Sequence, residues 1–403
     1  MTAPALDLQM LADPAVRADP YPLLHRLREA SPQVGKDGML VVTGRHSDIA
    51  AALRHPNASS QRRLSPLMPP DSVASALSFL SLDPPDHTRL RRLVSAAFTP
   101  RVVAGLRPRI TALVDELLDR VAADGRLDVV ADLAYPLPVQ IISELLGIPP
   151  EDHTQFRVWS EVLARALDPQ LVDPDPTLLA AAGAARAEFD RYLTTLIEAR
   201  RTHPRDDLLS LLISAESAGD RLTVDELLGT CVLLIVAGHE TTTNLIGNAI
   251  LALLRHPDQL DALRARPALV DGCVEETLRY DTPVQLTSRM AAGPLPVGDA
   301  VVPAGGLAML LIAAANRDPA VFDRPDRFDI TRPSGGHLAF AAGIHFCLGA
   351  GLARLEAAVA LDAFARRVVR PRLASPTIEY KANITLRGAA RLNVRFDGVT
   401  PTR

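Results

Sequence analysis

Apolar residues recur at helical spacing along much of the chain. Between Ile110 and Val121 they fall at i, i+3, i+4, i+7, i+8 and i+11, and Gly125 follows shortly afterwards. This spacing predicts an amphipathic helix that buries one face and ends near the glycine. Phe189, Leu193 and Ile197 repeat the spacing further along. Helices therefore dominate the predicted secondary structure.

Strand-like patterns are fewer and lie mainly near the two ends of the chain. Met39–Thr43 is a short β-favouring run, and Leu392, Val394 and Phe396 alternate with other residues near the C-terminus. No internal repeat or low-complexity linker divides the sequence. We therefore expect residues 1–403 to form a single, mainly α domain with a minor β region.

One predicted helix is longer and more apolar than the others. Thr223 and Glu226 have the spacing of a capping box, in which each side chain bonds the other residue's backbone N–H. The helical pattern then runs without proline to about Arg255, which is about 48 Å at 1.5 Å per residue. Because Cys231–Ala237 is apolar on every face, we expect this helix to cross the centre of the molecule.

A polar segment, residues 237–242 (Ala-Gly-His-Glu-Thr-Thr), interrupts this apolar helix. Gly238 removes side-chain bulk, and the Thr241 hydroxyl can bond the Ala237 carbonyl, so a groove with an acid and a hydroxyl beside it is expected. A kinked core helix with satisfied polar groups is the alternative. A zinc-hydrolase motif is excluded, because the second histidine of His-Glu-x-x-His would stand where the chain has Thr243.

Composition and charge exclude several classes of protein. The chain is 48% hydrophobic and 22% charged, with a net charge of −4, which argues against global disorder and against a basic nucleic-acid binder. Its three cysteines are far apart and predict no disulfide framework. The N-terminus lacks a signal-peptide pattern, and the apolar runs are shorter than the roughly 20 residues of a membrane span. We therefore expect a cytoplasmic protein that binds neither membrane nor nucleic acid.

The segment around Cys347 carries the strongest chemical signal. Phe340, Gly343 and Gly349 surround the cysteine, and an amphipathic run beginning at Leu352 follows it. A helix N-terminus favours a thiolate, and glycines allow a large flat ligand to approach the backbone. A single thiolate suits an axial ligand of haem iron, whereas zinc and iron–sulfur sites need several ligands. An inert buried cysteine is the alternative.

The pattern Phe340-x-x-Gly343-x-x-x-Cys347-x-Gly349 resembles the haem-binding signature of the cytochrome P-450 monooxygenases. Three further segments match the family in the same order: residues 85–92 its haem-contacting helix, residues 237–242 its oxygen-activating groove, and Glu276 with Arg279 its Glu-x-x-Arg pair. The resemblance covers nearly the whole chain. It implies the cytochrome P-450 fold, with a long central helix crossing over haem b (heme b, iron protoporphyrin IX).

The resemblance also implies roles for individual residues. Thr241 and Glu240 would be catalytic, in oxygen activation and proton relay. Cys347 would be the iron ligand, and the other residues expected to contact the haem, four of them at its propionates, are His87, Arg91, Arg289, His345, Phe340, Gly349 and Ala237. Glu276, Arg279 and Arg327 would form a structural ion network. One departure is Ala341, where the family often has glycine, and it is expected to affect the geometry of the loop.

The expected substrate pocket is largely aliphatic, which favours a small apolar or amphipathic substrate. The residues placed in it are Leu233, Val236, Ala237, Val284 and Gln285, with Leu286 and Ile384–Leu386 nearby and a roof from residues 58–80 and 168–185. The resemblance implies O2 as co-substrate and electrons from a separate ferredoxin and ferredoxin reductase. Arg89, Arg92 and Arg354 would face an acidic ferredoxin. The protein is expected to be a monomer.

The predicted function is a haem-thiolate monooxygenase that hydroxylates or epoxidises a small molecule, in natural-product metabolism. Two alternatives stay open. The first is a haem-thiolate enzyme that catalyses oxidative coupling, desaturation or rearrangement. The second is a haem-binding sensor or carrier without turnover. Product mass separates the first alternative from oxygen insertion, and donor-dependent oxidation separates the second.

Overall fold

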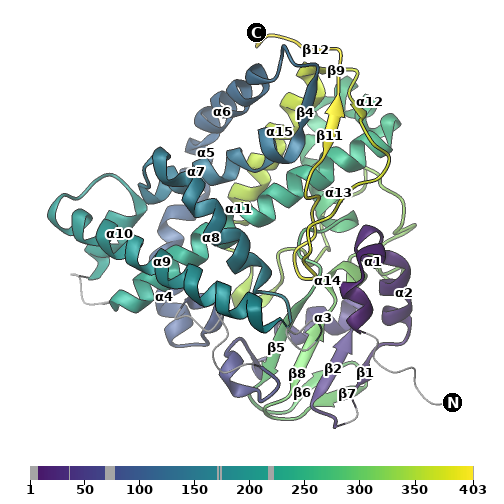
Figure 1. Cartoon of the computed structure of the whole chain (residues 1–403). Helices are drawn as coiled ribbons and strands as arrows, with labels where there is room; N and C mark the ends of the chain where they lie inside the picture. Colours follow the sequence, from purple (N-terminus) through teal and green to yellow (C-terminus); the bar gives the residue numbers. More distant parts are fainter. Residues whose placement is uncertain are drawn as a thin grey trace.

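The computed structural model describes residues 8–35, 37–68, 78–169, 172, 175–216 and 222–402. Helices fill most of the molecule, and the largest sheet lies at one end of it, beside the N-terminal helices (Figure 1). The α-helices are α1 (Pro14–Ala18), α2 (Tyr21–Glu29), α3 (His46–Ala52), α4 (Asp86–Ser95), α5 (Pro100–Gly105), α6 (Arg107–Arg120), α7 (Pro136–Leu146), α8 (His153–Arg165), α9 (Pro176–Thr202), α10 (Leu208–Glu216), α11 (Val224–Arg255), α12 (Pro257–Ala265), α13 (Val270–Tyr280), α14 (Ile312–Ala315) and α15 (Ala350–Arg367).

Short 3₁₀ segments and strands connect these helices. The 3₁₀ segments are η1 (Leu8–Ala12), η2 (Arg62–Leu64), η4 (Phe79–Ser81), η5 (Ala96–Phe98), η7 (Pro150–Asp152), η8 (Pro267–Leu269) and η9 (Gly343–His345), and η6 (Val129–Ala134) is a π-helix. The strands are β1 (Gln33–Val34), β2 (Leu40–Thr43), β3 (Ala58–Ser59), β4 (Arg126–Asp128), β5 (Thr287–Ala291), β6 (Leu295–Val297), β7 (Ala300–Val302), β8 (Leu307–Leu310), β9 (Val368–Val369), β10 (Arg372–Leu373), β11 (Asn393–Arg395) and β12 (Gly398–Val399). The prediction of a mainly α fold with a minor β region is confirmed.

The main sheet has five strands in the order β1-β2-β8-β5-β3. β2 runs parallel to β8, with Val41 opposite Ala308, and the other pairs are antiparallel. The predicted strand near the C-terminus forms β11, where Val394 is fully buried and pairs with Leu127 of β4. Segments far apart in the sequence therefore meet in both regions.

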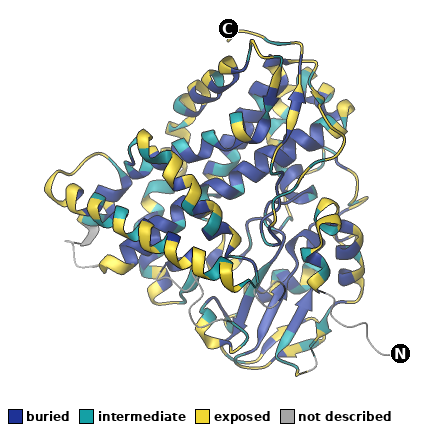
Figure 2. Cartoon of the chain, in the orientation of Figure 1, coloured by how far each residue is buried: buried dark blue, intermediate teal, exposed yellow. Residues whose placement is uncertain are grey.

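The long helix α11 is the structural centre of the molecule. Its capping box is complete: the Glu226 N–H donates to the Thr223 hydroxyl oxygen at 3.2 Å, and the Thr223 N–H donates to a Glu226 carboxylate oxygen at 2.8 Å. Its first half, with Cys231 and Ile235, packs in a cluster with α8, α9 and α10, and its second half packs with α6 and α15. α11 is buried along almost its whole length (Figure 2). The polar segment 237–242 falls where the two apolar clusters meet.

One segment of the described chain, Val129–Leu146, is long and apolar enough to cross a membrane. It forms η6 and α7, 61% of it is buried inside the protein, and both elements pack against α11. The apolar character of this segment is explained by its place in the core.

Candidate active site

A cavity of about 1370 Å³ separates α11 from the loop that precedes α15. Ala237 and Thr241 line it from α11, and Phe340, Cys347 and Gly349 line it from the loop. These residues are about 100 positions apart in the sequence, and the fold brings them to facing walls of one space. The predicted cysteine and the predicted groove therefore belong to the same site.

The groove in α11 is built as its sequence predicts. The Thr241 hydroxyl donates to the Ala237 carbonyl at 2.8 Å, and the Thr242 hydroxyl donates to the Gly238 carbonyl at 3.2 Å. A Cβ added at Gly238 would lie 3.4 Å from Ile142 of α7, which is an ordinary van der Waals contact, so packing against α7 does not require this glycine. α11 nevertheless stays helical through this segment, and Thr241 and Ala237 remain accessible from the cavity.

The cysteine loop is closed by backbone hydrogen bonds. The Cys347 N–H donates to the Phe340 carbonyl at 3.0 Å, and the Phe346 N–H donates to the Gly343 carbonyl at 3.1 Å. Gly343 has a φ of +72°, and a Cβ there would lie 2.5 Å from the Leu53 carbonyl oxygen. This glycine is needed for packing against the segment after α3. The expectation that it lets a flat ligand approach is therefore wrong for Gly343.

Ala341, which departs from the usual glycine, has a left-handed backbone with φ of +58°. A side chain in this conformation is strained by about 1–2 kcal/mol, because its Cβ lies too close to the following carbonyl. Ala341 lines the cavity and packs in the cluster of β5–β8 and α3. The surrounding loop thus holds an alanine in a conformation that suits glycine.

The Cys347 sulfur faces the cavity, and its pKa reflects opposing influences. Burial raises the pKa of the thiol, while the Gly349 and Ala350 N–H groups and the Arg91 and Arg354 guanidinium groups act to lower it. The N–H groups belong to the start of α15, as the sequence predicts. A metal ion at the sulfur would deprotonate the thiol outright.

Four nitrogen-rich side chains converge beside the cysteine loop. The His87 and His345 rings are 4.3 Å apart, and within the described chain their four ring nitrogens have no hydrogen-bond partner. Burial and the nearby Arg289, His87 and Arg91 lower the pKa of His345 to about 3. Burial lowers the pKa of Arg289 to about 10, and its side chain bonds only Thr287 and Ser288 among the described residues. Asp83 is the acid whose charge acts on His87 and Arg289, and none of the described hydrogen bonds joins it to the four donors. Grouped donors of this kind fit the two propionates of a haem.

Arg91 lies on the same helix, α4, one turn after His87, and lines the cavity. Its guanidinium donates to the Phe346 carbonyl at 2.5 Å, which ties α4 to the cysteine loop. The residues present therefore fit haem b: Cys347 would hold the iron, and His87, Arg91, Arg289 and His345 would hold the propionates. Phe340, Gly349 and Ala237 line the same cavity.

Glu240, the residue before Thr241 on α11, is not among the residues that line the cavity. Its carboxylate is buried and accepts a hydrogen bond from Lys381 Nζ at 2.8 Å. Burial opposes its ionisation, but Lys381, His239 and Arg157 together hold the pKa of Glu240 below its usual value. Burial lowers the pKa of His239, so this ring is neutral near pH 7, and its Nδ1–H donates to the Ile235 carbonyl at 2.6 Å. Lys381 is a site residue that the sequence patterns did not single out.

The expected ion network is present with one change of partner. Arg279 binds both oxygens of the Glu276 carboxylate, each at 2.8 Å, and both side chains are buried. The second cation on Glu276, and so the third member of the network, is Arg332, at 3.1 Å, and the inclusion of the Arg327 side chain is wrong. Arg327 points into solvent, 3.9 Å from Asp329, and only its backbone carbonyl accepts from Arg279.

A second cavity, of about 1700 Å³ with its mouth to solvent included, adjoins the first on the α11 side. Leu233, Val236, Ala237, Thr241 and Val284 line it, in agreement with the expected substrate pocket. The expected roof is described only in part, because residues 69–77, 170–171 and 173–174 lie outside the described residues. From these two regions the wall includes Ser60, Arg62, Leu67, Met68, Ser78, Leu80 and Pro169.

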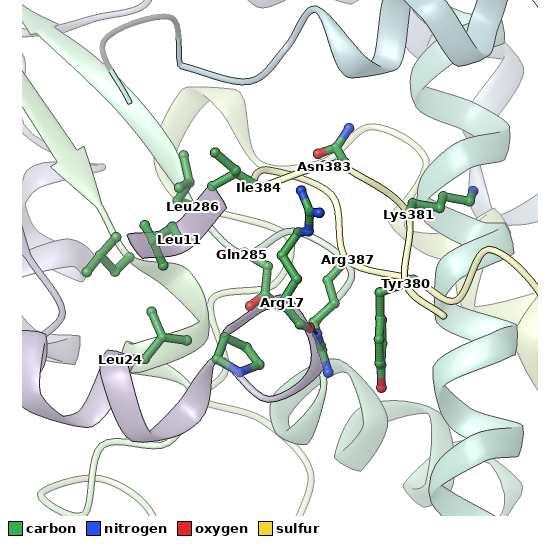
Figure 3. A pocket seen from close by; sticks show the side chains of 13 residues that line it. Leu11, Arg17, Leu24, Gln285, Leu286, Tyr380, Lys381, Asn383, Ile384 and Arg387 are labelled. Carbon is green, nitrogen blue, oxygen red and sulfur yellow. Dashed lines mark hydrogen bonds between the residues drawn. The ribbon is translucent and has the colours of Figure 1, made fainter. Parts of the chain in front are cut away.

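Gln285 does not line this cavity, so its place in the substrate pocket is wrong. Figure 3 shows it beside Leu24 and Arg17, in a separate small pocket near the N-terminal helices. Its side-chain amide donates to the Thr282 carbonyl at 2.7 Å. Val284 and Leu286 line the substrate cavity on either side of it, because successive residues of an extended segment point in opposite directions.

The three arginines that were expected to face a ferredoxin have different surroundings in the structure. Arg89 forms an ion pair with Glu226 at the start of α11, so this side chain does not face a partner beside Cys347. Arg354 binds both oxygens of Glu275 and lies over the Phe340 ring. Arg92 is exposed on α4. Of the three expected residues, Arg92 is the one that is exposed, and the other two are partly buried.

A thiolate candidate that faces a helix groove across a cavity, beside four propionate donors, defines a haem-thiolate protein. Comparison with known proteins agrees with this class: the family model for cytochrome P450 matches residues 33–367, and the chain belongs to that family. Haem b is its cofactor, and the chain is an oxidoreductase of the monooxygenase class.

Several curated relatives and solved structures are similar over nearly the whole chain. The cytochrome P450 monooxygenase PikC of Streptomyces venezuelae is 44% identical over 409 residues, covering 98% of this chain and 94% of the relative. The vitamin D(3) 25-hydroxylase of Pseudonocardia autotrophica is 42% identical over 392 residues, with 93% of each covered. The ligand-free crystal structure of Mycobacterium smegmatis CYP164A2 is 49% identical, with a TM-score of 0.92, covering 96% of this chain and 99% of that one. The predicted family and fold are thus confirmed.

Proposed function

We propose that this monooxygenase inserts one atom of O2 into a C–H or C=C bond of an apolar or amphipathic small molecule. The observation that carries the proposal is the position of Thr241, which lines both the cavity of Cys347 and the aliphatic cavity beside it. A molecule in the second cavity would lie against the groove where oxygen is activated. Haem b supplies the oxidising chemistry when it is bound.

The side chains of α11 would manage the protons that oxygen activation consumes. The Thr241 hydroxyl hydrogen is used in the bond to the Ala237 carbonyl. The hydroxyl oxygen can therefore accept a hydrogen bond from a group in the cavity, such as water. Glu240 directly precedes Thr241; it is not among the residues that line the cavity, and its carboxylate binds Lys381. We assign Glu240 and Lys381 to the passage of protons from solvent to the groove, and Thr241 to their delivery.

The walls of the aliphatic cavity indicate the kind of substrate. Leu163, Leu167, Val232, Leu286 and Leu386 contribute to its lining, which favours a lipophilic body. Relatives carry names or ligands of this kind, including vitamin D(3) in one name, and testosterone and myristic acid in two solved complexes. These names support a lipophilic substrate of natural-product metabolism for the present chain.

The electron donor is proposed to be an acidic ferredoxin served by a ferredoxin reductase. Exposed Arg92 on α4, near the start of α15 and the cysteine loop, is the charge that would steer it. Exchange of Arg92 for glutamate is expected to raise the apparent Michaelis constant for the donor at low salt. An unchanged constant would place the docking face elsewhere.

We also propose that the chain works as a cytoplasmic monomer and that residues 1–403 form one domain. The four apolar clusters of the described residues share elements: α11 belongs to the two largest, and β8 contributes to the other two. A single cooperative thermal transition, with the mass of a monomer in solution, is the expected result.

The test of the proposed function combines a spectrum with a product. The dithionite-reduced protein with carbon monoxide is expected to show the Soret band of a thiolate-ligated haem, and Cys347→Ala is expected to lose it. Turnover with a ferredoxin system is expected to add one oxygen atom to the substrate. A product lacking two hydrogens would favour coupling or desaturation, and binding without donor-dependent oxidation would favour a sensor.

A further inference from the structure

Arg62 is a charged side chain in the wall of the otherwise aliphatic cavity. It belongs to η2, and it shares the cavity with Leu67, Met68 and Thr241. Within the described residues its guanidinium has no hydrogen-bond or ion-pair partner, and burial alone lowers its pKa. Arginine stays ionised in proteins, so a partly buried guanidinium without a counter-charge favours an anionic ligand.

Nearby groups are paired in ways that leave Arg62 out. Asp83 accepts from the Ser59 hydroxyl, the Ser60 N–H and the Gln61 side-chain amide. Arg63, the next residue, is exposed and donates twice to the Gln61 side-chain oxygen. The described contacts of Asp83 and Arg63 therefore include none to Arg62.

A second arginine in the same cavity wall shows the contrast. Arg186 of α9 donates from Nε to both oxygens of Asp190, one turn later, at 2.8 and 2.9 Å. Its charge is thus balanced inside the protein. Arg289, a third arginine of this wall, has no acid among its described hydrogen bonds either, and it is assigned to the haem propionates. Arg62 is therefore the cavity arginine that is left for a substrate to neutralise.

We propose that Arg62 binds the carboxylate of the substrate, and that the substrate is a lipophilic carboxylic acid. This inference rests on the proposed function, since it concerns what enters the aliphatic cavity. The planar guanidinium offers two parallel N–H donors, which match the two oxygens of a carboxylate. The apolar walls would enclose the hydrocarbon body, which extends to Thr241 because both residues line one cavity.

The same geometry directs oxidation away from the carboxyl group. With the carboxylate held at η2, the carbon atoms that reach Ala237 and Thr241 on α11 belong to the body of the molecule. Binding at Arg62 therefore orients the substrate as well as holding it. Loss of the anchor is expected to broaden the distribution of product isomers.

The test compares myristic acid with myristamide, which has the same chain and no charge. Binding is followed by the spin-state shift of the holoenzyme at a pH where the acid is ionised. The wild type is expected to bind the acid about tenfold more tightly than the amide. Arg62→Gln is expected to abolish this preference, because it weakens the binding of myristic acid and leaves the binding of myristamide unchanged. Arg62→Lys is expected to retain part of the preference. Arg63→Gln, the matched surface control, is expected to retain all of it.

Three outcomes would overturn the inference. The wild type could bind the acid and the amide with equal affinity, Arg62→Gln could lower the affinity for both ligands equally, or Arg63→Gln could lose the preference for the acid as Arg62→Gln does. The carbon monoxide spectrum and the affinity for myristamide report whether each variant is folded and holds thiolate-ligated haem. If the wild type has a normal spectrum and turns over the amide but shows no preference for the acid, then carboxylate binding by Arg62 is refuted and the proposed function is not. Failure of the spectrum in the wild type would instead refute the proposed function.

Discussion

Lys381 Nζ lies 2.8 Å from the Glu240 carboxylate, and this ion pair joins the loop before β11 to the middle of α11. The carboxylate is 4% exposed and the lysine 26%, so the pair reaches from the core toward solvent. A buried carboxylate without a counter-charge would take up a proton and stay neutral. Lys381 therefore keeps Glu240 ionised at the position from which protons are proposed to reach Thr241.

Replacement of Lys381 by methionine is expected to slow turnover about tenfold with little change in haem content or substrate affinity. The physical reason is that the variant removes the Lys381 Nζ–Glu240 hydrogen bond, through which protons are proposed to pass from solvent. The pKa of Glu240 also rises when its main counter-charge is lost, so the pH dependence of turnover should move. Steady-state turnover and the pH dependence of kcat measure the effect. An unchanged pH profile would contradict the assignment of Glu240 and Lys381 to proton passage.

The same variant makes a prediction about stability. In the wild type the pKa of Glu240 is below its usual value, so its contribution to stability is present above about pH 4 and is lost as pH falls through the lowered pKa. In Lys381→Met the pKa is raised, and stability is lost as pH rises through it. The free energy of unfolding of Lys381→Met is expected to be about 3 kcal/mol lower than that of the wild type, and this difference should be larger at about pH 8 than at about pH 5. Glu240→Gln with Lys381→Met is expected to remove this pH dependence.

Exchange of Thr241 for alanine is expected to leave the fold intact and to divert reducing equivalents to hydrogen peroxide. The hydroxyl bonds the Ala237 carbonyl and faces the cavity, and alanine is a good helix former, so stability changes by less than about 0.5 kcal/mol. Product formed per NAD(P)H consumed is expected to fall about tenfold. Thr241→Ser keeps the hydroxyl and serves as the control. Tight coupling in the alanine variant would count against the role of Thr241.

Exchange of Ala341 for glycine is expected to stabilise the protein by about 1 kcal/mol, because glycine adopts the φ of +58° without strain. The melting temperature should rise by about 1–2 °C, with the thiolate Soret band unchanged. Ala342 is the matched control, because its φ of −154° suits alanine and its exchange for glycine should cost about 1 kcal/mol. Equal effects of the two exchanges would show that Ala341 carries no backbone strain.

Features encoded by neighbouring residues could be predicted from the sequence. The capping box of α11 depends on residues three positions apart, and the bond from Thr241 to Ala237 on residues four apart. Helical geometry alone brings such pairs together. The start of α11 and the groove were therefore predictable to within a residue or two.

Features that depend on distant segments were not predictable in the same way. Lys381 is 141 positions from Glu240, and no local pattern relates a lysine in a C-terminal loop to an acid on a central helix. Gln285 was misplaced because the direction of each side chain in an extended segment depends on register, which β5 and its neighbours determine. The propionate donors were predictable only through the family resemblance, since α4, β5 and the cysteine loop meet through tertiary packing.

The ion network offers a prediction that distinguishes its two candidate arginines. Arg332 is 16% exposed and contacts the buried Glu276 carboxylate, whereas Arg327 is 52% exposed and offers that network only its backbone carbonyl. Arg332→Ala is expected to lower the free energy of unfolding by about 2 kcal/mol, because it removes a cation from a carboxylate that has lost its hydration. Arg327→Ala should change it by less than about 0.5 kcal/mol. Denaturant unfolding of the two variants measures both values. A larger loss of unfolding free energy in Arg327→Ala than in Arg332→Ala would show that the Arg327 side chain belongs to the network.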